Sequence, residues 1–252
     1  MVARKPEPNI GQIIDALEEV NRRLNATNAL LLALARGRTE SLALDGPAAL
    51  APDTEGFGDA SVAEIAPAGG DEAVLRHLAL PHGLSAPMEK LIDLRNARYP
   101  DSRPRYWGIV NFGLHSAKPR LFLFDVMERT TRSYLCAHGS GSEGPTDDGF
   151  ANVFSNTPGS AATSLGIYRC AETYTSDDNG YSLKLDGLDS TNSNARARLI
   201  VMHGAWYVSQ EFANAHGRIG RSQGCPALDH AHARTVIDQL KGGSLLFHWK
   251  GH

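Results

Sequence analysis

The chain between residues 106 and 249 is divided into short segments that end at turn-forming residues, and this limits the possible folds more than any other feature. Most segments are rich in aromatic or β-branched side chains, which favour β-strands. An α/β chain would alternate such strands with helices, and this alternation is missing. We therefore predict a mainly β fold, an antiparallel sandwich or barrel with flanking helices, whose seven strands cover residues 106–112, 120–127, 133–137, 165–174, 181–185, 198–203 and 244–249.

Two helices are expected beside these strands. The first covers residues 84–97 and is ended by Pro100. The second starts within residues 226–229 and runs through Leu240, with Asp229 as a candidate N-cap and a glycine pair at 242–243 as its stop. This assignment puts Cys225 on a turn that leads directly into a helix.

The N-terminal part of the chain has a different composition. Apolar residues recur at helical spacing between Ile10 and Leu24, so residues 1–38 are predicted to contain an amphipathic helix. Packing on the rest of the chain, self-association and membrane-proximal spacing are the possible roles of this helix, and the first two are favoured because its apolar stripe must be covered. Residues 39–70 are rich in Ala, Gly and Pro and are interpreted as a linker, and residues 71–252 as the catalytic domain.

The bulk composition argues against several classes of function. A net charge of -3 and a pI near 6.4 provide no basic surface for phosphate groups, so nucleic acid is not an expected partner. The three cysteines lack CxxC spacing and the ten histidines include no HExxH motif, so neither a metal nor another cofactor is expected. Residues 22–35 faintly resemble a secretion signal, but acidic residues precede them and no intact signal is expected.

The stretch GRSQGCP, residues 220–226, places a cysteine between glycine and proline. A thiol attacks a carbonyl as its thiolate and needs a nearby base, and a following helix dipole would favour the thiolate. His203 ends an apolar strand 22 residues before Cys225, and Gly204 beside it leaves room for approach. Taken singly, such a cysteine is more often a buried apolar residue, and such a histidine a plain surface residue.

The order of these motifs is similar to that of a known family. His203-Gly204 followed by RSQGCP at 221–226 resembles the signature of the L,D-transpeptidase catalytic domain, the YkuD-like peptidoglycan cross-linking enzymes. The branch with proline after the cysteine matches best. Further similar segments lie at 137–142, 154–160, 164–166 and 182–188, so the resemblance covers residues 106–249. It implies the β fold of that family and a place in the periplasm or cell envelope.

The resemblance also implies a role for each matched residue. Cys225 is the expected nucleophile and His203 its general base. The backbone carbonyl of Gly204 is expected to orient the imidazole in place of an acidic third residue. Backbone N–H groups at Gly224 and Cys225 are expected to form the oxyanion hole.

Five further residues are candidates for substrate contact or support. Ser222 is expected to support the turn, and Gln223 departs from the histidine found in much of the family, because glutamine cannot exchange a proton near neutral pH. His138 is either the wall of a substrate groove or part of a glycine-rich surface turn. Arg221 is expected to hold a substrate carboxylate or a structural salt bridge. Tyr207 is expected either to line the cleft or to pack in the core or at the rim.

The implied reaction has two halves and joins two peptidoglycan stem peptides. The cysteine attacks the amide carbonyl at the L-centre of a diamino acid in the donor stem, releases the terminal D-amino acid and leaves a thioester. An amine of the acceptor stem then closes the cross-link, without metal or ATP. With water or a free D-amino acid as acceptor, the same site is an L,D-carboxypeptidase or an exchange enzyme. A third alternative is a non-catalytic peptidoglycan-binding module, which carbapenems would not acylate as they acylate active cysteines in this family.

Overall fold

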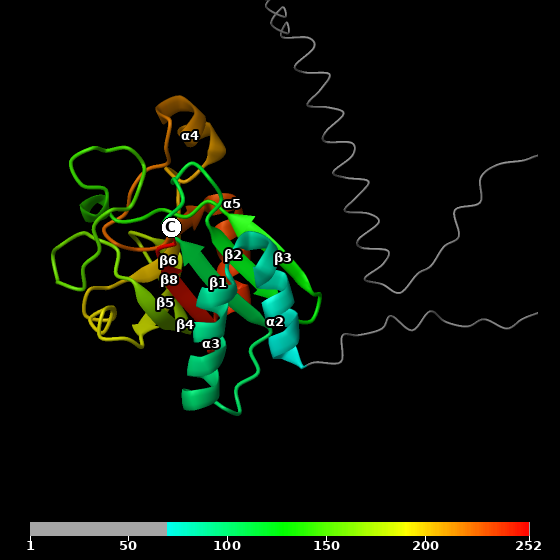
Figure 1. Cartoon of the computed structure of the whole chain (residues 1–252). Coiled ribbons are helices and arrows are strands. Elements are labelled where there is room, and N and C mark those ends of the chain that lie inside the picture. The colour runs from blue at the N-terminus through cyan, green and yellow to red at the C-terminus, as the bar shows by residue number, and fades with distance from the viewer. Residues whose placement is uncertain (1–69, 252) are drawn as a thin grey trace, which may run out of the picture. The chain divides into compact units, whose positions relative to one another are not determined.

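The computed structural model describes residues 70–251, which form an eight-stranded sheet with four α-helices (Figure 1). The helix predicted within residues 1–38 lies outside the described residues, as does the predicted linker except for its last residue. The described helices are α2 (Asp71–Ala79), α3 (Ser85–Arg98), α4 (Gln210–His216) and α5 (His230–Leu240).

The sheet is mainly antiparallel, as the sequence predicts. Its strands are β1 (Tyr106–Asn111), β2 (Leu121–Asp125), β3 (Thr130–Tyr134), β4 (Gly166–Ser176), β5 (Gly180–Gly187), β6 (Val201–Ala205), β7 (Ala227–Asp229) and β8 (Leu245–Trp249). Their spatial order is β3-β2-β1-β8-β4-β5-β6-β7. Two neighbouring pairs, β1 with β8 and β6 with β7, are parallel, and the other five pairs are antiparallel.

The sheet curls into a nearly closed barrel, because the chain after β3 reaches β7 at the other end of the strand order. Cys136 forms an antiparallel bridge with Leu228, and the N–H of Ala137 donates to the carbonyl oxygen of Ala227 at 2.8 Å. The barrel, rather than the sandwich, is therefore the observed form of the predicted β fold. Apolar side chains of the strands and of α5 share its core, among them Leu183, Leu185, Met202, Val236 and Leu240.

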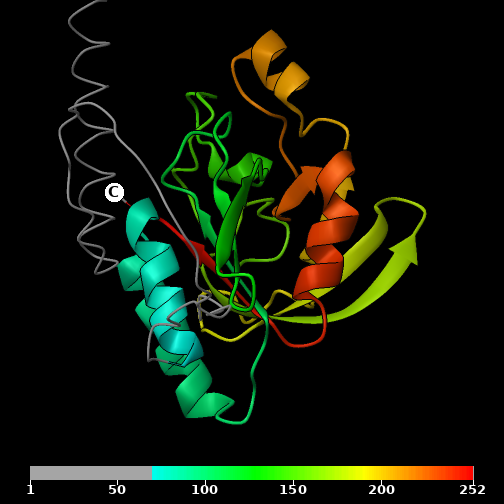
Figure 2. The same cartoon turned by 90° about the vertical axis from the view of Figure 1, so that its right-hand side faces the viewer.

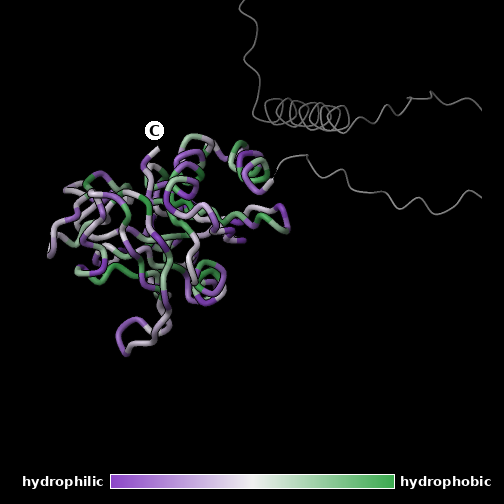
Figure 3. The backbone as a smooth tube through the Cα atoms, turned by 90° about the horizontal axis from the view of Figure 1, so that it is seen from below, coloured by the Kyte–Doolittle hydropathy of each residue, from purple (hydrophilic) through white to green (hydrophobic). Residues whose placement is uncertain are grey.

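Helices cover both sides of the strands. Figure 2 shows α2 and α3 side by side on one side and α5 on the other. The α2–α3 pair shares a second core with Trp107, Ile109, Phe122 and Phe124 of β1 and β2. Coloured by hydropathy, the helices carry hydrophobic and hydrophilic residues within each turn (Figure 3), as expected for helices with one buried face.

Two predicted strands are displaced in the structure. β3 covers Thr130–Tyr134 rather than 133–137, because its side chains are exposed or half-buried and lack the apolar pattern of a core strand. β6 begins at Val201 rather than at residue 198 and runs past His203 to Ala205. The shift at its start has a local cause, since Leu199 has a φ of 56°, which no strand accommodates.

The late helix also starts later than predicted. Residues 227–229 form β7, which pairs with β6, and α5 begins only at His230. The N-cap prediction is confirmed, because the Asp229 carboxylate accepts a hydrogen bond from the N–H of Ala231 at 2.9 Å. Helices α2 and α4 were not predicted, although α4 carries cap signals in Ser209 at its start and Gly217, with a φ of 73°, at its end.

Two buried histidines are expected to make folding stability depend on pH. Burial lowers the pKa of His138 to about 3, with help from Arg120, and the pKa of His248 to about 4. Both titrate near 6.5 in the unfolded chain, so below that pH the unfolded state binds more protons and stability falls. Each histidine should remove roughly 1.4 kcal/mol of unfolding free energy per pH unit between about pH 6 and pH 4.5.

Urea unfolding at pH 7, 6 and 5 measures this dependence. Replacing His248 by Gln should reduce the slope by the share of one histidine. A variant whose pH slope equals that of the wild type would show that His248 is not the titrating group.

Candidate active site

Cys225 lies on a tight turn just before β7, and Ser222 bridges both ends of this turn. The hydroxyl of Ser222 donates to the carbonyl of Cys225 at 2.7 Å and accepts from the N–H of Gly224 at 3.1 Å. Gly224 has a φ of 113°, and a Cβ at this position would lie 2.8 Å from the carbonyl oxygen of Ala162. Glycine is therefore required here both for conformation and for space. Gln223 is exposed on the same turn.

The sulfur of Cys225 contacts the backbone around the start of β6. The N–H of Val201 donates to Sγ at 3.5 Å, and Sγ lies 3.7 Å from the carbonyl oxygen of Leu199, to which the thiol donates. Although Cys225 keeps some exposed surface, burial raises the pKa of its thiol more than the Val201 N–H and the Arg198 guanidinium lower it. The thiol is therefore neutral at pH 7. The predicted thiolate at a helix N-terminus is wrong, because β7 separates Cys225 from α5.

His203 lies in the middle of β6 and its side chain is largely buried. Its Nδ1 lies 3.0 Å from the carbonyl oxygen of Gly204. Because a carbonyl only accepts hydrogen bonds, Nδ1 carries the proton and Nε2 is left with a lone pair. Burial lowers the pKa of His203, and the Gly204 contact only partly opposes this. The imidazole is therefore neutral at pH 7 and able to accept a proton.

The absence of a side chain at residue 204 has a packing reason in addition to the predicted one. A Cβ on Gly204 would lie 2.6 Å from Nδ1 of His230 and 3.2 Å from Cβ of Ala233, both on α5. Glycine here lets α5 approach β6, and Gly204 also lines the open cleft that reaches His203.

The parallel pairing of β6 and β7 brings Cys225 and His203 to nearby positions. His203 is in register with Ala227, and Cys225 precedes Ala227 by two residues. The sulfur contacts Val201, which precedes His203 by two residues, so the two side chains start about 7 Å apart along the strands. Among residues 70–251, no hydrogen bond joins the sulfur to the imidazole, and the thiol contacts backbone groups instead.

The predicted pair of oxyanion donors is only half available. The N–H of Gly224 is engaged by the hydroxyl of Ser222 and is not free for a substrate oxygen. The N–H of Cys225 has no hydrogen-bond partner in the part of the chain that the structure describes. Of the two predicted donors, therefore, only the N–H of Cys225 is free to bind a substrate oxygen.

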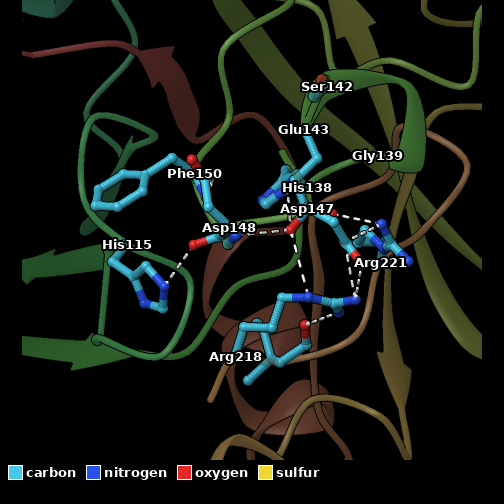
Figure 4. Close-up of polar contacts among 12 residues, drawn as sticks. His115, His138, Gly139, Ser142, Glu143, Asp147, Asp148, Phe150, Arg218 and Arg221 are labelled. Carbon is cyan, nitrogen blue, oxygen red and sulfur yellow. Dashed lines mark hydrogen bonds and ion pairs between the residues drawn. The ribbon is translucent and has the colours of Figure 1, made fainter. Parts of the chain in front are cut away.

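An ion-pair network around the buried Glu143 carboxylate lies beside the turn (Figure 4). The Glu143 carboxylate is 1% exposed, and Arg221 donates to it at 2.5 Å. Arg218 lies 3.7 Å from the same carboxylate, and Asp147 pairs with both arginines at 2.5 and 2.9 Å. Arg221 thus makes a structural salt bridge, one of the two roles that its sequence position left open.

His138 is fully buried next to this network, so neither of its predicted positions, a groove wall or a surface turn, is found. Arg120 donates to its Nδ1 at 2.7 Å, and Nε2 lies 3.7 Å from the Glu143 carboxylate. Because arginine only donates, Nδ1 accepts and Nε2 carries the proton that faces Glu143. The carbonyl of His138 accepts from the N–H of Ser222 at 2.9 Å, which connects the network to the Cys225 turn.

An open cleft of about 420 Å³ reaches His203 from the side of β5 and α5. Tyr181, Tyr207 and Arg234 are among its other lining residues. Tyr207 also packs against a small apolar core that includes Val208 and Ile219, so it takes both of the positions considered for it. Burial raises the pKa of Tyr207 to about 12, and the nearby Cys225 contributes to this rise. Cys225 itself does not line the cleft, whereas His203 and Tyr207 do.

Comparison with known proteins assigns the chain to a family. A family model described as the L,D-transpeptidase catalytic domain matches residues 84–249, more than half of the chain. The chain belongs to this family. Within its described residues, no group of three or more His, Cys, Asp or Glu side chains could hold a metal ion. No helix of residues 70–251 is long and apolar enough to cross a membrane.

Three solved structures are similar to parts of this L,D-transpeptidase domain. The first is an L,D-transpeptidase from Mycobacterium smegmatis, with 9% sequence identity, a match that covers 57% of this chain and 58% of that one, and a TM-score of 0.35. The second is LD transpeptidase LdtMt1 in complex with imipenem, with 12% identity, coverage of 57% of this chain and 59% of that one, and a TM-score of 0.34. The third is an L,D-transpeptidase from Mycobacterium tuberculosis H37Rv, with 16% identity, coverage of 58% of each chain, and a TM-score of 0.34. The matched parts span less than two thirds of those chains. No curated protein matches the chain.

The L,D-transpeptidase domain contains a positioning residue that sequence reasoning missed. Arg198 donates to the carbonyl oxygens of Ser155 at 2.8 Å and Ala162 at 2.6 Å, and to two serine hydroxyls of the same segment. It thereby holds the segment that packs against Gly224. The sequence predicts Arg198 at the start of a strand. Leu199 has a left-handed backbone conformation that excludes Arg198 from the strand, and no sequence signal marks this conformation.

Proposed function

We propose that this domain is a peptidoglycan L,D-transpeptidase that works through Cys225 and His203. The observation that carries the proposal is a partly exposed thiol on a glycine turn, two residue steps from a neutral imidazole on the neighbouring parallel strand. Membership in the L,D-transpeptidase family supports the same reaction class. The substrates would be a donor and an acceptor stem peptide, and the place of action the periplasm or cell envelope, where those peptides occur.

In the first half-reaction, the neutral thiol must leave the Leu199 carbonyl and turn toward His203. Nε2 takes the thiol proton while Sγ attacks the amide carbonyl at the L-centre of the donor diamino acid. The N–H of Cys225 stabilises the oxyanion, and Nδ1 stays bound to the Gly204 carbonyl. When the C–N bond breaks, His203 returns the proton to the departing D-amino acid and a thioester remains.

In the second half-reaction, a neutral amine of the acceptor stem attacks the thioester carbonyl. The new C–N bond forms as the C–S bond breaks, and the amine proton passes through His203 to the departing sulfur. The free thiol is restored, and the amide bond of the donor has been exchanged for the amide bond of the cross-link. This balance requires no metal, nucleotide or redox partner.

Purified tetrapeptide muropeptides test the proposal when they are incubated with the wild type and with Cys225→Ala. Cross-linked dimers are expected with the wild type and none with the variant. Tripeptide alone would instead assign an L,D-carboxypeptidase, and altered terminal residues an exchange enzyme. Cys170→Ala, which removes a fully buried thiol, is the matched control and should keep activity.

A carbapenem provides a second measurement that is independent of the acceptor. The intact mass of the wild type should increase by one carbapenem adduct, and the mass of Cys225→Ala should not. A wild type that gives neither products nor adduct would leave the peptidoglycan-binding module as the better description.

A further inference from the structure

The cleft that reaches His203 contains a cation that forms no salt bridge in the described part of the chain. Arg234, on α5, lines the cleft and is exposed. Among the ion pairs of residues 70–251, none includes Arg234, although Asp238, one helical turn away, is close enough for the Arg234 charge to help lower its pKa. By contrast, Arg218 and Arg221, near Cys225 in sequence, are both engaged by buried or neighbouring carboxylates.

The guanidinium of Arg234 is held in place by an aromatic platform. It lies 4.3 Å from the ring centroid of Tyr181, which also lines the cleft. The hydroxyl of Tyr181 donates to Asp238 at 2.6 Å, and the Asp238 carboxylate is already paired with Lys241 at 2.7 Å. The ring is thus anchored at its far end, and a guanidinium stacked on it loses little further freedom when it binds a ligand.

The other groups that line the cleft define the ligand it would accept. The imidazole of His203 is neutral, so Arg234 is the cationic group that an anionic ligand meets beside the proposed base. Asp178, at the tip of the β4–β5 hairpin, lines the same cleft with the opposite charge. A planar guanidinium binds a carboxylate through two parallel hydrogen bonds. A peptide that carries both a carboxylate and an amine therefore matches this cleft.

We propose that Arg234 is the recognition group for an amino-acid carboxylate of the substrate. This inference rests on the proposed function, because the cleft is the one that reaches His203. Two carboxylates share the required chemistry. One is the terminal carboxylate of the donor tetrapeptide, which leaves with the D-amino acid, and the other is the carboxylate next to the amine of the acceptor diamino acid.

Binding without turnover tests the inference separately from the reaction. Tetrapeptide donor and tripeptide acceptor are titrated into Cys225→Ala and into Cys225→Ala with Arg234→Gln, with calorimetry as the readout. Loss of Arg234 is expected to lower the binding affinity for one of the two peptides by about 10- to 100-fold, which is the range expected for a charged bidentate contact. Arg234→Lys, which keeps the charge but loses the planar fork, should give an intermediate loss.

Amidated peptides identify which carboxylate is bound. Amidation of the recognised carboxylate should weaken binding to the Arg234 protein as much as the substitution does, and should have no further effect on Arg234→Gln. One experiment amidates the terminal carboxylate of the donor, and the other amidates the carboxylate of the acceptor diamino acid. The carboxylate whose amidation weakens binding only when Arg234 is present is the one that Arg234 recognises. Arg132→Gln removes an exposed arginine on β3, away from this cleft, and should bind both peptides like its parent.

The inference would be overturned if, for both peptides, amidation lowered the binding affinity equally in the protein with Arg234 and in the Arg234→Gln variant. The proposed function fails differently, through a wild type that forms no dimer and no carbapenem adduct. Because binding is measured in the Cys225→Ala background, recognition by Arg234 is decided in either case.

Discussion

Replacing His203 by Gln is expected to lower the rate of acyl-enzyme formation by a factor of about 10² to 10⁴, the range of a general base. The thiol of the free enzyme is neutral because burial raises the pKa of Cys225, so the sulfur depends on a partner that removes its proton. In the proposed mechanism, the neutral Nε2 of His203 is that partner. Glutamine keeps a polar side chain at this position but cannot accept the proton.

The rate of carbapenem acylation, followed by mass, measures this effect across pH. Because burial lowers the pKa of His203, the wild-type rate should hold down to about pH 6.5 and fall only below it, as the imidazole becomes protonated. The glutamine variant should lose this acid limb. His232→Gln, at an exposed position on α5, is the matched control. A His203→Gln rate close to that of the wild type would mean that another group is the base.

Removing the buried carboxylate of Glu143 is expected to destabilise the fold by about 2 kcal/mol, because Glu143→Ala removes the charged hydrogen bond from Arg221 and leaves only Asp147 to pair with the two arginines. The carboxylate is 1% exposed, so water does not replace it. The same carboxylate faces His138, whose backbone holds Ser222 and through it the Cys225 turn. We therefore expect slower carbapenem acylation by the folded variant in addition to the loss of stability.

Urea unfolding at pH 7 compares Glu143→Ala with Glu128→Ala. Glu128 forms an ion pair with Arg105, but its side chain is 67% exposed, so its loss should cost less than about 1 kcal/mol. Similar stabilities of the two variants would show that the Glu143 pair adds nothing beyond a surface contact. Wild-type acylation by a destabilised Glu143→Ala would separate the network from the Cys225 turn.

Local patterns in the sequence were sufficient for the elements that form the core. β1, β2, β4, β5 and β8 were predicted close to their observed bounds, because their side chains are apolar and the residues that follow them break the pattern. The cap at Asp229 depends on neighbouring backbone and was also predicted correctly. β3 was misplaced because an exposed edge strand has no apolar pattern, and β7 because its three residues form a strand only where β6 lies alongside.

The sequence by itself determined which chemical groups were available: a cysteine on a glycine turn, a histidine in a strand, and a motif order that leads to the L,D-transpeptidase family. Only the tertiary structure decided their states. The thiol of Cys225 is neutral, His138 is buried and Arg221 is committed to Glu143, because burial and partner charges come from segments far apart in the chain. Desolvation and long-range ion pairs depend on distances in space, which residue spacing along a chain does not specify.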